Sequence, residues 1–237
     1  MRMVGGMVTP ASDEVEIWVV ALHAGAEAEA DVATLSEQEA ERYATLDCDA
    51  RAIAVRARAT LRQVLGRRLA AAPADVRIVE GADAKPTLAG RELEFNVAHT
   101  DGLAVIAVAH VAVGVDVERI EAIAPDEFDD LVAFVLTERE LEELARLPEQ
   151  ERLAAYYRVW TRKEAFVKAT GEGIARRPLP EIVVGVGPPA LVRVVGMRAG
   201  ELACWSVVDL DVPSGYVASL VARHSRLRVT ARRWPHR

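Results

Sequence analysis

Apolar residues at alternate positions mark several short strands along this chain. In residues 111–120, VAVGVDVERI, valine occupies every second position up to 117, and acidic residues stand at 116 and 118. Side chains alternate across a strand, so the valines line one face while Asp116 and Glu118 share the other. Because like charges repel, this pattern favours a positive group close to the two carboxylates.

Other segments carry the 3.6-residue period of helices. Three of the expected helices cover residues 35–46, 49–70 and 149–173. Ser36 and Glu39 have the spacing of a capping box at the start of the first helix, and Gly171 is typical of the end of the third. A basic stripe follows one face of the second helix and consists of Arg51, Arg58 and Arg62.

The order strand, helices, strands occurs twice along the chain. In each half, two strands are joined by a glycine turn, in residues 93–109 and again in residues 204–222. The sequence therefore predicts an α+β fold of two pseudo-symmetric lobes, each a small antiparallel sheet packed with helices. Residues 1–113 form the predicted N-terminal lobe, and residues 114–237 form the predicted C-terminal lobe.

Length, composition and charge exclude several classes of protein. The 237 residues are 51% hydrophobic and 27% charged, which is typical of a globular chain with enough apolar material for a core. The longest apolar run, residues 103–115, is shorter than the roughly 20 residues of a membrane-spanning helix. The formal net charge of −7 argues against nucleic acid as the main partner, because phosphate binding needs clustered basic charge.

The two ends of the chain add little to this picture. Residues 1–14 lack the apolar stretch and cleavage site of a secretory signal, so we expect a cytoplasmic protein with no membrane association. The last 15 residues contain six arginines, which we interpret as a solvated edge strand and tail rather than a binding surface.

A carboxylate lies on the apolar stripe of the helix expected over residues 149–173. This stripe consists of Leu153, Tyr156, Tyr157, Trp160 and Val167. Glu164 follows Trp160 by four residues and therefore faces the same way. Burying an ionised group without compensation costs several kcal/mol, so Glu164 must be protonated, paired with a cation or bound to a metal. Together with Asp116 and Glu118 it would offer the oxygen ligands that Mg²⁺ prefers.

Each of these residues also has a purely structural interpretation. An Asp-x-Glu pair on a strand commonly lies on a solvated sheet face, and Glu164 could pair with a neighbouring arginine such as Arg158. A histidine near a strand end, such as His99, is commonly structural, although a phosphate contact is within its chemistry. Lys163 and Lys168 flank Glu164, and such lysines are either exposed or act as point charges on a phosphate.

Five stretches together resemble one family, the 4′-phosphopantetheinyl transferases, in the larger two-lobed (Sfp-like) type that activates carrier proteins of polyketide, nonribosomal-peptide and related synthases. In chain order they are AKPTL, FNVAHTDG, VGVDVER, FVLTERE and WTRKEAFVKATGEGI. Any one of them is a weak signal. The combination of G-x-D-x-E with a later W-x-x-K-E-A-x-x-K is specific, and it favours the functional interpretation of the three carboxylates.

The resemblance implies that coenzyme A and Mg²⁺ bind in a cleft between the two lobes. Asp116, Glu118 and Glu164 match the family's metal ligands. The residues that match contacts to coenzyme A are Arg58, Lys85, His99 and Lys168, with Arg58 near the 3′-phosphate. Two positions depart from the family pattern: Ala84 replaces a glycine, and Ala98 replaces a serine whose hydroxyl could contact phosphate. Thr100 is the candidate to replace that contact.

The implied reaction is transfer of the 4′-phosphopantetheine arm from coenzyme A to a serine of an apo acyl or peptidyl carrier protein, of the holo-[acyl-carrier-protein] synthase type, releasing adenosine 3′,5′-bisphosphate. Glu164 is the candidate to take the serine proton, and Lys168 to stabilise phosphate charge. Two alternatives stay open: a non-catalytic homologue that binds coenzyme A or carrier, and a Mg²⁺-dependent phosphohydrolase. We expect a monomer, because one chain supplies both lobes.

Overall fold

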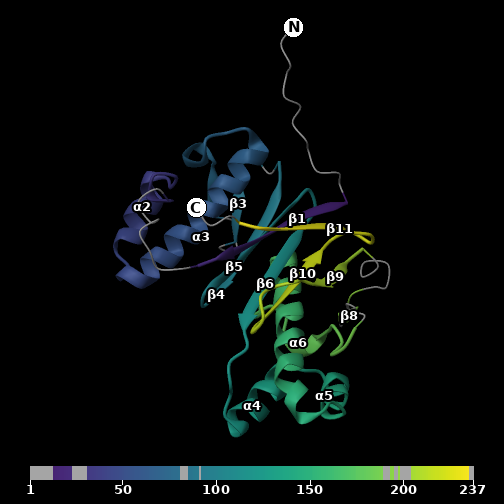
Figure 1. Ribbon diagram of the computed structural model, residues 1–237. Coiled ribbons are helices and arrows are strands. Elements are labelled where there is room, and N and C mark those ends of the chain that lie inside the picture. Colours follow the sequence, from purple (N-terminus) through teal and green to yellow (C-terminus); the bar gives the residue numbers. More distant parts are fainter. Residues whose placement is uncertain are drawn as a thin grey trace.

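Two sheets lie face to face, and each is covered on its outer side by one long helix (Figure 1). The structure is a computed structural model that describes residues 13–22, 31–80, 85–90, 92–188, 193–194, 197 and 204–234. The alternation of the strands produces the layers, because every second side chain enters the space between the sheets and the others face a helix.

The first sheet has the strand order β11–β1–β5–β4. Its strands are β1 (Glu14–Ala21), β4 (Glu94–Thr100), β5 (Leu103–Ala109) and β11 (Arg228–Arg233). β1 pairs antiparallel with β5 and parallel with β11. The other elements of this half are α2 (Glu37–Ala44), α3 (Cys48–Leu69), the short helix η1 (Pro73–Asp75) and the paired strands β2 (Ile78–Glu80) and β3 (Pro86–Leu88).

The second sheet has the strand order β6–β10–β9 and is antiparallel. Its strands are β6 (Val113–Arg119), β9 (Ser206–Asp209) and β10 (Tyr216–Ala222). Its helices are α4 (Pro125–Val135), α5 (Glu138–Ala145) and α6 (Glu149–Thr170), followed by the short helix η2 (Leu179–Glu181) and the paired strands β7 (Ile182–Val183) and β8 (Arg193–Val194).

The two halves repeat one plan, as the sequence predicts. In each, a first strand pairs antiparallel with the second strand of a later pair, giving β1–β5–β4 and β6–β10–β9. In each, a helix of 22 residues, α3 or α6, covers the outer face. The predicted α+β fold of pseudo-symmetric halves is therefore confirmed.

One strand departs from the simple division of the chain. β11 comes from the C-terminal end and adds to the first sheet as its outer strand, where most of its residues are exposed. The arginine-rich segment therefore contains the predicted edge strand, although it pairs parallel rather than antiparallel, and residues 235–237 lie outside the described part. β11 belongs by sequence to the predicted C-terminal lobe but pairs in the sheet of the first half. The predicted boundary after residue 113 stays a prediction.

The alternation in β6 determines what faces α6. Val113, Val115 and Val117 are buried in the cluster between the two sheets. The residues between them therefore face α6, and the first of these is a glycine for a steric reason. A Cβ at Gly114 would lie 2.1 Å from the carbonyl oxygen of Ala165, so α6 lies against the strand too closely for any side chain there. Asp116 follows on the same face, next to the helix.

Helix ends and turns follow the sequence signals. The capping box of α2 forms as predicted, since Ser36 accepts from the backbone N–H of Glu39 and the Glu39 carboxylate accepts from that of Ser36. Gly171 ends α6 with φ 74°, and Gly102 turns β4 into β5 with φ 76°, both in the left-handed region that glycine adopts easily. In the described part of the chain, no helix combines the length and apolarity needed to cross a membrane.

Candidate active site

One face of α6 lies along the acidic face of β6. Trp160, Glu164 and Lys168 recur every four residues and so share that face of the helix. The Trp160 Nε1 donates to Glu118 Oε1 over 3.2 Å, and the Lys168 Nζ donates to Asp116 Oδ1 over 2.6 Å. Helix and strand therefore run in opposite directions, and Glu164 lies between the two contacts.

The three carboxylates influence one another electrostatically. Burial, together with the negative charges of Asp116 and Glu164, raises the pKa of Glu118 to about 7. Burial raises the pKa of Asp116, although the Lys168 ammonium opposes this. Burial and then the charge of Asp116 raise the pKa of Glu164. The carboxylates predicted from separate segments thus influence one another electrostatically, and the Lys168 ammonium lies beside Asp116.

Two oxygens of these carboxylates are buried without a hydrogen-bond partner among the described residues, namely Asp116 Oδ2 and Glu164 Oε1. An unsatisfied buried acceptor costs free energy, which a bound cation would recover. The Arg158 side chain, the structural alternative for Glu164, instead donates to the Val186 carbonyl over 3.4 Å. The donor set therefore suits a hard cation such as Mg²⁺.

The side chains are not already arranged around a metal position. Within the described residues, no three His, Cys, Asp or Glu side chains are grouped as metal ligands would be. The cation beside Asp116 is the Lys168 ammonium. Mg²⁺ binding by Asp116, Glu118 and Glu164 therefore stays a prediction, which the unpartnered oxygens support.

A cavity of about 430 Å³ opens beside these residues. Glu164, Lys168 and Lys85 are among the residues that line it. The Lys85 Nζ donates to the backbone carbonyl of Lys168 over 2.7 Å and to that of Val113 over 3.3 Å, and burial lowers its pKa. Lys85 therefore connects the first half of the chain to the end of α6, and Ala84 before it lies outside the described residues.

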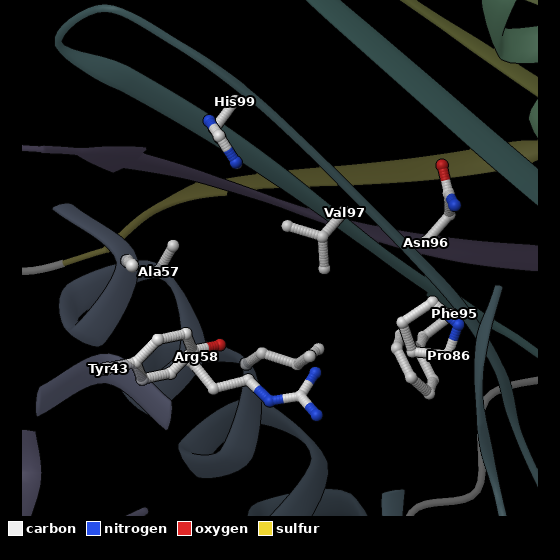
Figure 2. A pocket seen from close by; sticks show the side chains of 10 residues that line it. Tyr43, Ala57, Arg58, Pro86, Phe95, Asn96, Val97 and His99 are labelled. Atoms are coloured by element: carbon white, nitrogen blue, oxygen red, sulfur yellow. The ribbon is translucent and has the colours of Figure 1, made fainter. Parts of the chain in front are cut away.

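A second cavity, of about 250 Å³, lies between α3 and β4. Figure 2 shows Arg58 reaching from α3 and His99 extending from β4 on the facing side. Pro86 and Asn96 line both cavities. The structure thus divides the predicted site into two neighbouring cavities, with Glu164 and Lys168 lining one and Arg58 and His99 lining the other.

The residues next to His99 occupy different surroundings. Ala98 is 4% exposed and belongs to the apolar cluster between the sheets, so a hydroxyl there would not face the same side as His99. Thr100 follows His99 in β4 and therefore also points to the opposite side of the strand. Neither residue lines the two cavities, and the role predicted for Thr100 stays a prediction.

Two polar residues matter more than the sequence indicated. The sequence predicts that Lys163 is exposed or near a phosphate, but the residue is fully buried. Its Nζ lies 2.7 Å from Glu140 Oε2 and donates to the carbonyls of Val135 and Leu179. Asn96 Oδ1 accepts from the Val115 N–H over 2.8 Å and so joins β4 to β6. An asparagine inside an apolar strand was the available signal for that link.

The basic stripe of α3 is largely paired. Glu39 lies 2.5 Å from the Nε of Arg58 and 2.5 Å from the Nε of Arg62. Arg62 is only 2% exposed, so it does not contribute to a basic surface. Of these two arginines, Arg58 alone lines the cavity opposite His99.

Comparisons with known proteins identify relatives along most of the chain. A family model described as ACPS: 4′-phosphopantetheinyl transferase superfamily matches residues 112–221. The 4′-phosphopantetheinyl transferase HetI of Nostoc sp. (strain PCC 7120) is 32% identical over 222 residues, covering 90% of this chain and 89% of that protein. The 4′-phosphopantetheinyl transferase Sfp of Bacillus subtilis (strain 168) is 22% identical over 165 residues, covering 69% of this chain and 70% of that protein.

A solved structure, the holo-[acyl-carrier-protein] synthase (AcpS) of Thermotoga maritima, matches 49% of this chain and 64% of its own with 21% identity and a TM-score of 0.39. That likeness is too slight to add to the assignment. The similarity to HetI extends over nearly the full length of both proteins, and the family model covers β6 and α6, the two elements that carry the carboxylates. The chain therefore belongs to the 4′-phosphopantetheinyl transferase superfamily.

Proposed function

We propose that this protein transfers the 4′-phosphopantetheine arm of coenzyme A to a serine hydroxyl of an apo acyl or peptidyl carrier protein. The observation that carries the proposal is that Asp116 on β6 and Glu164 on α6 each have a buried oxygen without a partner among the described residues. Lys168 pairs with Asp116, and Glu164 and Lys168 line a cavity. Family membership supports the same reaction class.

The reaction forms a bond between the serine oxygen and the phosphorus attached to pantetheine. It breaks the bond from that phosphorus to the bridging oxygen of the pyrophosphate, whose electron pair leaves with adenosine 3′,5′-bisphosphate. Charge in such a transfer lies on the phosphate oxygens, so the Lys168 ammonium stabilises it electrostatically. Glu164, whose pKa is raised by burial, is our candidate to accept the serine proton.

The residues proposed to hold Mg²⁺ are Asp116, Glu118 and Glu164, through oxygens that include the unpartnered Asp116 Oδ2 and Glu164 Oε1. When bound there, Mg²⁺ supplies positive charge to the pyrophosphate oxygens of coenzyme A. Trp160 holds Glu118 by a hydrogen bond, and Lys168 holds Asp116, so α6 positions two of the three carboxylates.

The nucleotide end of coenzyme A is proposed to occupy the cavity between α3 and β4. Arg58 and His99 lie on facing walls of that hollow and supply donors for phosphate oxygens. Lys85 lines the neighbouring cavity and donates to backbone carbonyls of β6 and α6. We propose that it orients the end of α6 and contacts coenzyme A through the remaining N–H group of its ammonium.

The partner surface must overcome the overall charge of the protein. At a net charge of −7, an acidic carrier would be repelled at long range, so we propose a local contact near the cavity that contains Glu164. We further propose a cytoplasmic monomer that takes neither nucleic acid nor membrane as a partner. That contact would determine which carrier protein the enzyme accepts.

The test incubates the protein with coenzyme A, Mg²⁺ and several apo carrier proteins, and measures each carrier by mass spectrometry. We expect the mass of one phosphopantetheine arm to appear on a carrier serine, and Asp116→Ala to abolish it. Asp129→Ala, which removes an exposed carboxylate of α4, is the matched control and should load carrier normally.

The outcomes separate the alternatives. Coenzyme A that binds without any loading of carrier would show a non-catalytic homologue. Coenzyme A cleaved without a carrier product would show a phosphohydrolase. Full activity of Asp116→Ala would refute the assignment of this carboxylate.

A further inference from the structure

We propose that Glu39 is a positioning residue for coenzyme A: it holds the Arg58 guanidinium by its Nε so that the two terminal nitrogens remain directed at a phosphate in the cavity between α3 and β4. This inference rests on the proposed function. It assigns to Glu39, on α2, a role in distinguishing coenzyme A from dephospho-coenzyme A, the analogue that lacks the 3′-phosphate.

Glu39 is itself held firmly. Its Oε2 accepts from the backbone N–H of Ser36 over 3.0 Å, in the capping box that begins α2. The same oxygen lies 2.5 Å from Arg62 Nε, while Oε1 lies 2.5 Å from Arg58 Nε. Burial would raise the pKa of Glu39, but the hydrogen bonds from Arg62 and Ser36 and the charge of Arg58 lower it, so the carboxylate is ionised.

The two arginines on this carboxylate are used differently. Arg62 is buried and donates through Nη1 to the carbonyls of Pro73, Ala74 and Val76 over 2.8–3.2 Å, so its role is structural. Within the described residues, Arg58 forms only the bond from its Nε to Glu39. Its terminal nitrogens therefore stay available, on a side chain that lines the cavity facing His99 (Figure 2).

This division suits phosphate recognition. A guanidinium carries five N–H donors in a rigid fork, and an anchor on Nε leaves the four on Nη1 and Nη2 for a bidentate contact. Ordering a long side chain before the ligand arrives removes an entropic cost that binding would otherwise include. Loss of that order corresponds to roughly a 3- to 10-fold weaker contact with the 3′-phosphate.

The experiment compares the dissociation constants of coenzyme A and dephospho-coenzyme A by calorimetry for the wild-type protein, Glu39→Gln, Arg58→Met and the double variant. We expect Glu39→Gln to raise the dissociation constant of coenzyme A roughly 3- to 10-fold and to leave that of dephospho-coenzyme A nearly unchanged. In the Arg58→Met background, Glu39→Gln should have no further effect on the ratio. A stronger preference of Glu39→Gln for coenzyme A over dephospho-coenzyme A would show that the charge of Glu39 opposes the phosphate, and would overturn the proposal.

Asp31 supplies the matched control. Its carboxylate lies 3.0 Å from Arg56 Nη1, on the same helix α3, but neither residue lines the cavity. Asp31→Asn removes a comparable ion pair, so it should leave the ratio of the two dissociation constants unchanged even where it lowers stability. A change in this ratio equal to that of Glu39→Gln would make the effect a general one of α3 packing, and would overturn the proposal.

Arg58→Lys provides a second test if Glu39→Gln does not fold. Arg58→Lys preserves both the positive charge and Glu39, but a lysine has one ammonium, which Glu39 would draw to itself. It should lose the preference for the 3′-phosphate as Arg58→Met does, and a wild-type ratio would refute positioning through Nε. Failure of the wild-type protein to bind coenzyme A at all would instead refute the proposed function.

Discussion

Single side chains of this protein differ in function according to what satisfies them. Lys163 and Glu164 are neighbours in the sequence, yet Lys163 is fully paired inside the protein while Glu164 retains a buried oxygen with no partner in the described part of the chain. Buried polar groups are normally satisfied, so an exception beside a cavity points to a ligand. Hydrogen-bond satisfaction therefore distinguishes the structural Lys163 from the candidate site residue Glu164, although the two are adjacent in the sequence.

The Glu140–Lys163 pair should be among the largest contributors to stability. Both side chains are fully buried, and removing one partner leaves an uncompensated charge, so Lys163→Met should lower the free energy of unfolding by about 3–5 kcal/mol. Denaturant unfolding measures the change. The surface pair of Glu142 on α5 and Arg146 just after it is the control, since Arg146→Ala breaks an exposed ion pair and should change stability little. Equal effects of the two substitutions would contradict the burial argument.

Metal binding should depend on the unpartnered carboxylates. In the presence of coenzyme A, we expect Asp116→Asn to weaken Mg²⁺ or Mn²⁺ binding at least about tenfold, because a ligand charge is lost. Calorimetry with each metal measures it, and a chelator should abolish carrier loading until Mg²⁺ is restored. Glu172 lines the same cavity but is paired with Arg177, so Glu172→Gln should bind metal normally. Unchanged metal affinity in Asp116→Asn would remove this residue from the proposed site.

The site depends on how closely α6 lies on β6. Gly114 allows the approach, and the buried hydroxyls of Thr161 and Ser219, 2.9 Å apart, join α6 to β10 beside it. Ser219 is also the register partner of Asp116. The positions of the carboxylates are therefore a consequence of helix-on-sheet packing.

Gly114→Ala should consequently damage both stability and the site. The added Cβ would lie 2.1 Å from the Ala165 oxygen and 2.4 Å from the Ala169 nitrogen, and backbone atoms cannot move aside as a side-chain tip can. Overpacking costs about 1–3 kcal/mol, and we expect this variant at or above that range. Thermal unfolding and carrier loading measure the two effects. Gly187→Ala, whose Cβ would meet nothing within 4 Å, should be neutral, and a neutral Gly114→Ala would contradict the packing.

Local sequence patterns predict the helices and strands well, whereas the burial and pairing of individual charged side chains depend on tertiary contacts. The alternation of β6 and the inward position of Glu164 are local, so the convergence of the acidic face with α6 followed from the sequence once the resemblance joined the two segments. The burial of Lys163 depends on Glu140, and the pairing of Arg58 depends on Glu39. Neither partner is adjacent along the chain, and spacing within one element does not reveal it.

The last described strand, β11, joins the C-terminal part of the chain to the first sheet. β11 lies parallel to β1, and Trp234 beyond it packs edge to face with Trp18 at 5.2 Å between ring centroids. The backbone N–H of Trp234 donates to the Val19 carbonyl over 2.8 Å, and the Arg67 guanidinium lies 4.7 Å from the Trp234 ring centroid. The C-terminal end therefore completes the core of the first sheet, on the side away from the carboxylates of β6.

This separation predicts that stability and chemistry respond independently at Trp234. Trp234 is 7% exposed, so Trp234→Ala should lower the free energy of unfolding by about 3–5 kcal/mol through the cavity it leaves. The rate of carrier loading per folded molecule, at saturating coenzyme A and a temperature below unfolding, should stay within about twofold, because β6 and α6 keep their own contacts. Arg233→Ala, an exposed neighbour, should change neither quantity. A large loss of loading in folded Trp234→Ala would mean that the first sheet positions the carboxylates, and that the two halves act as one unit in the reaction.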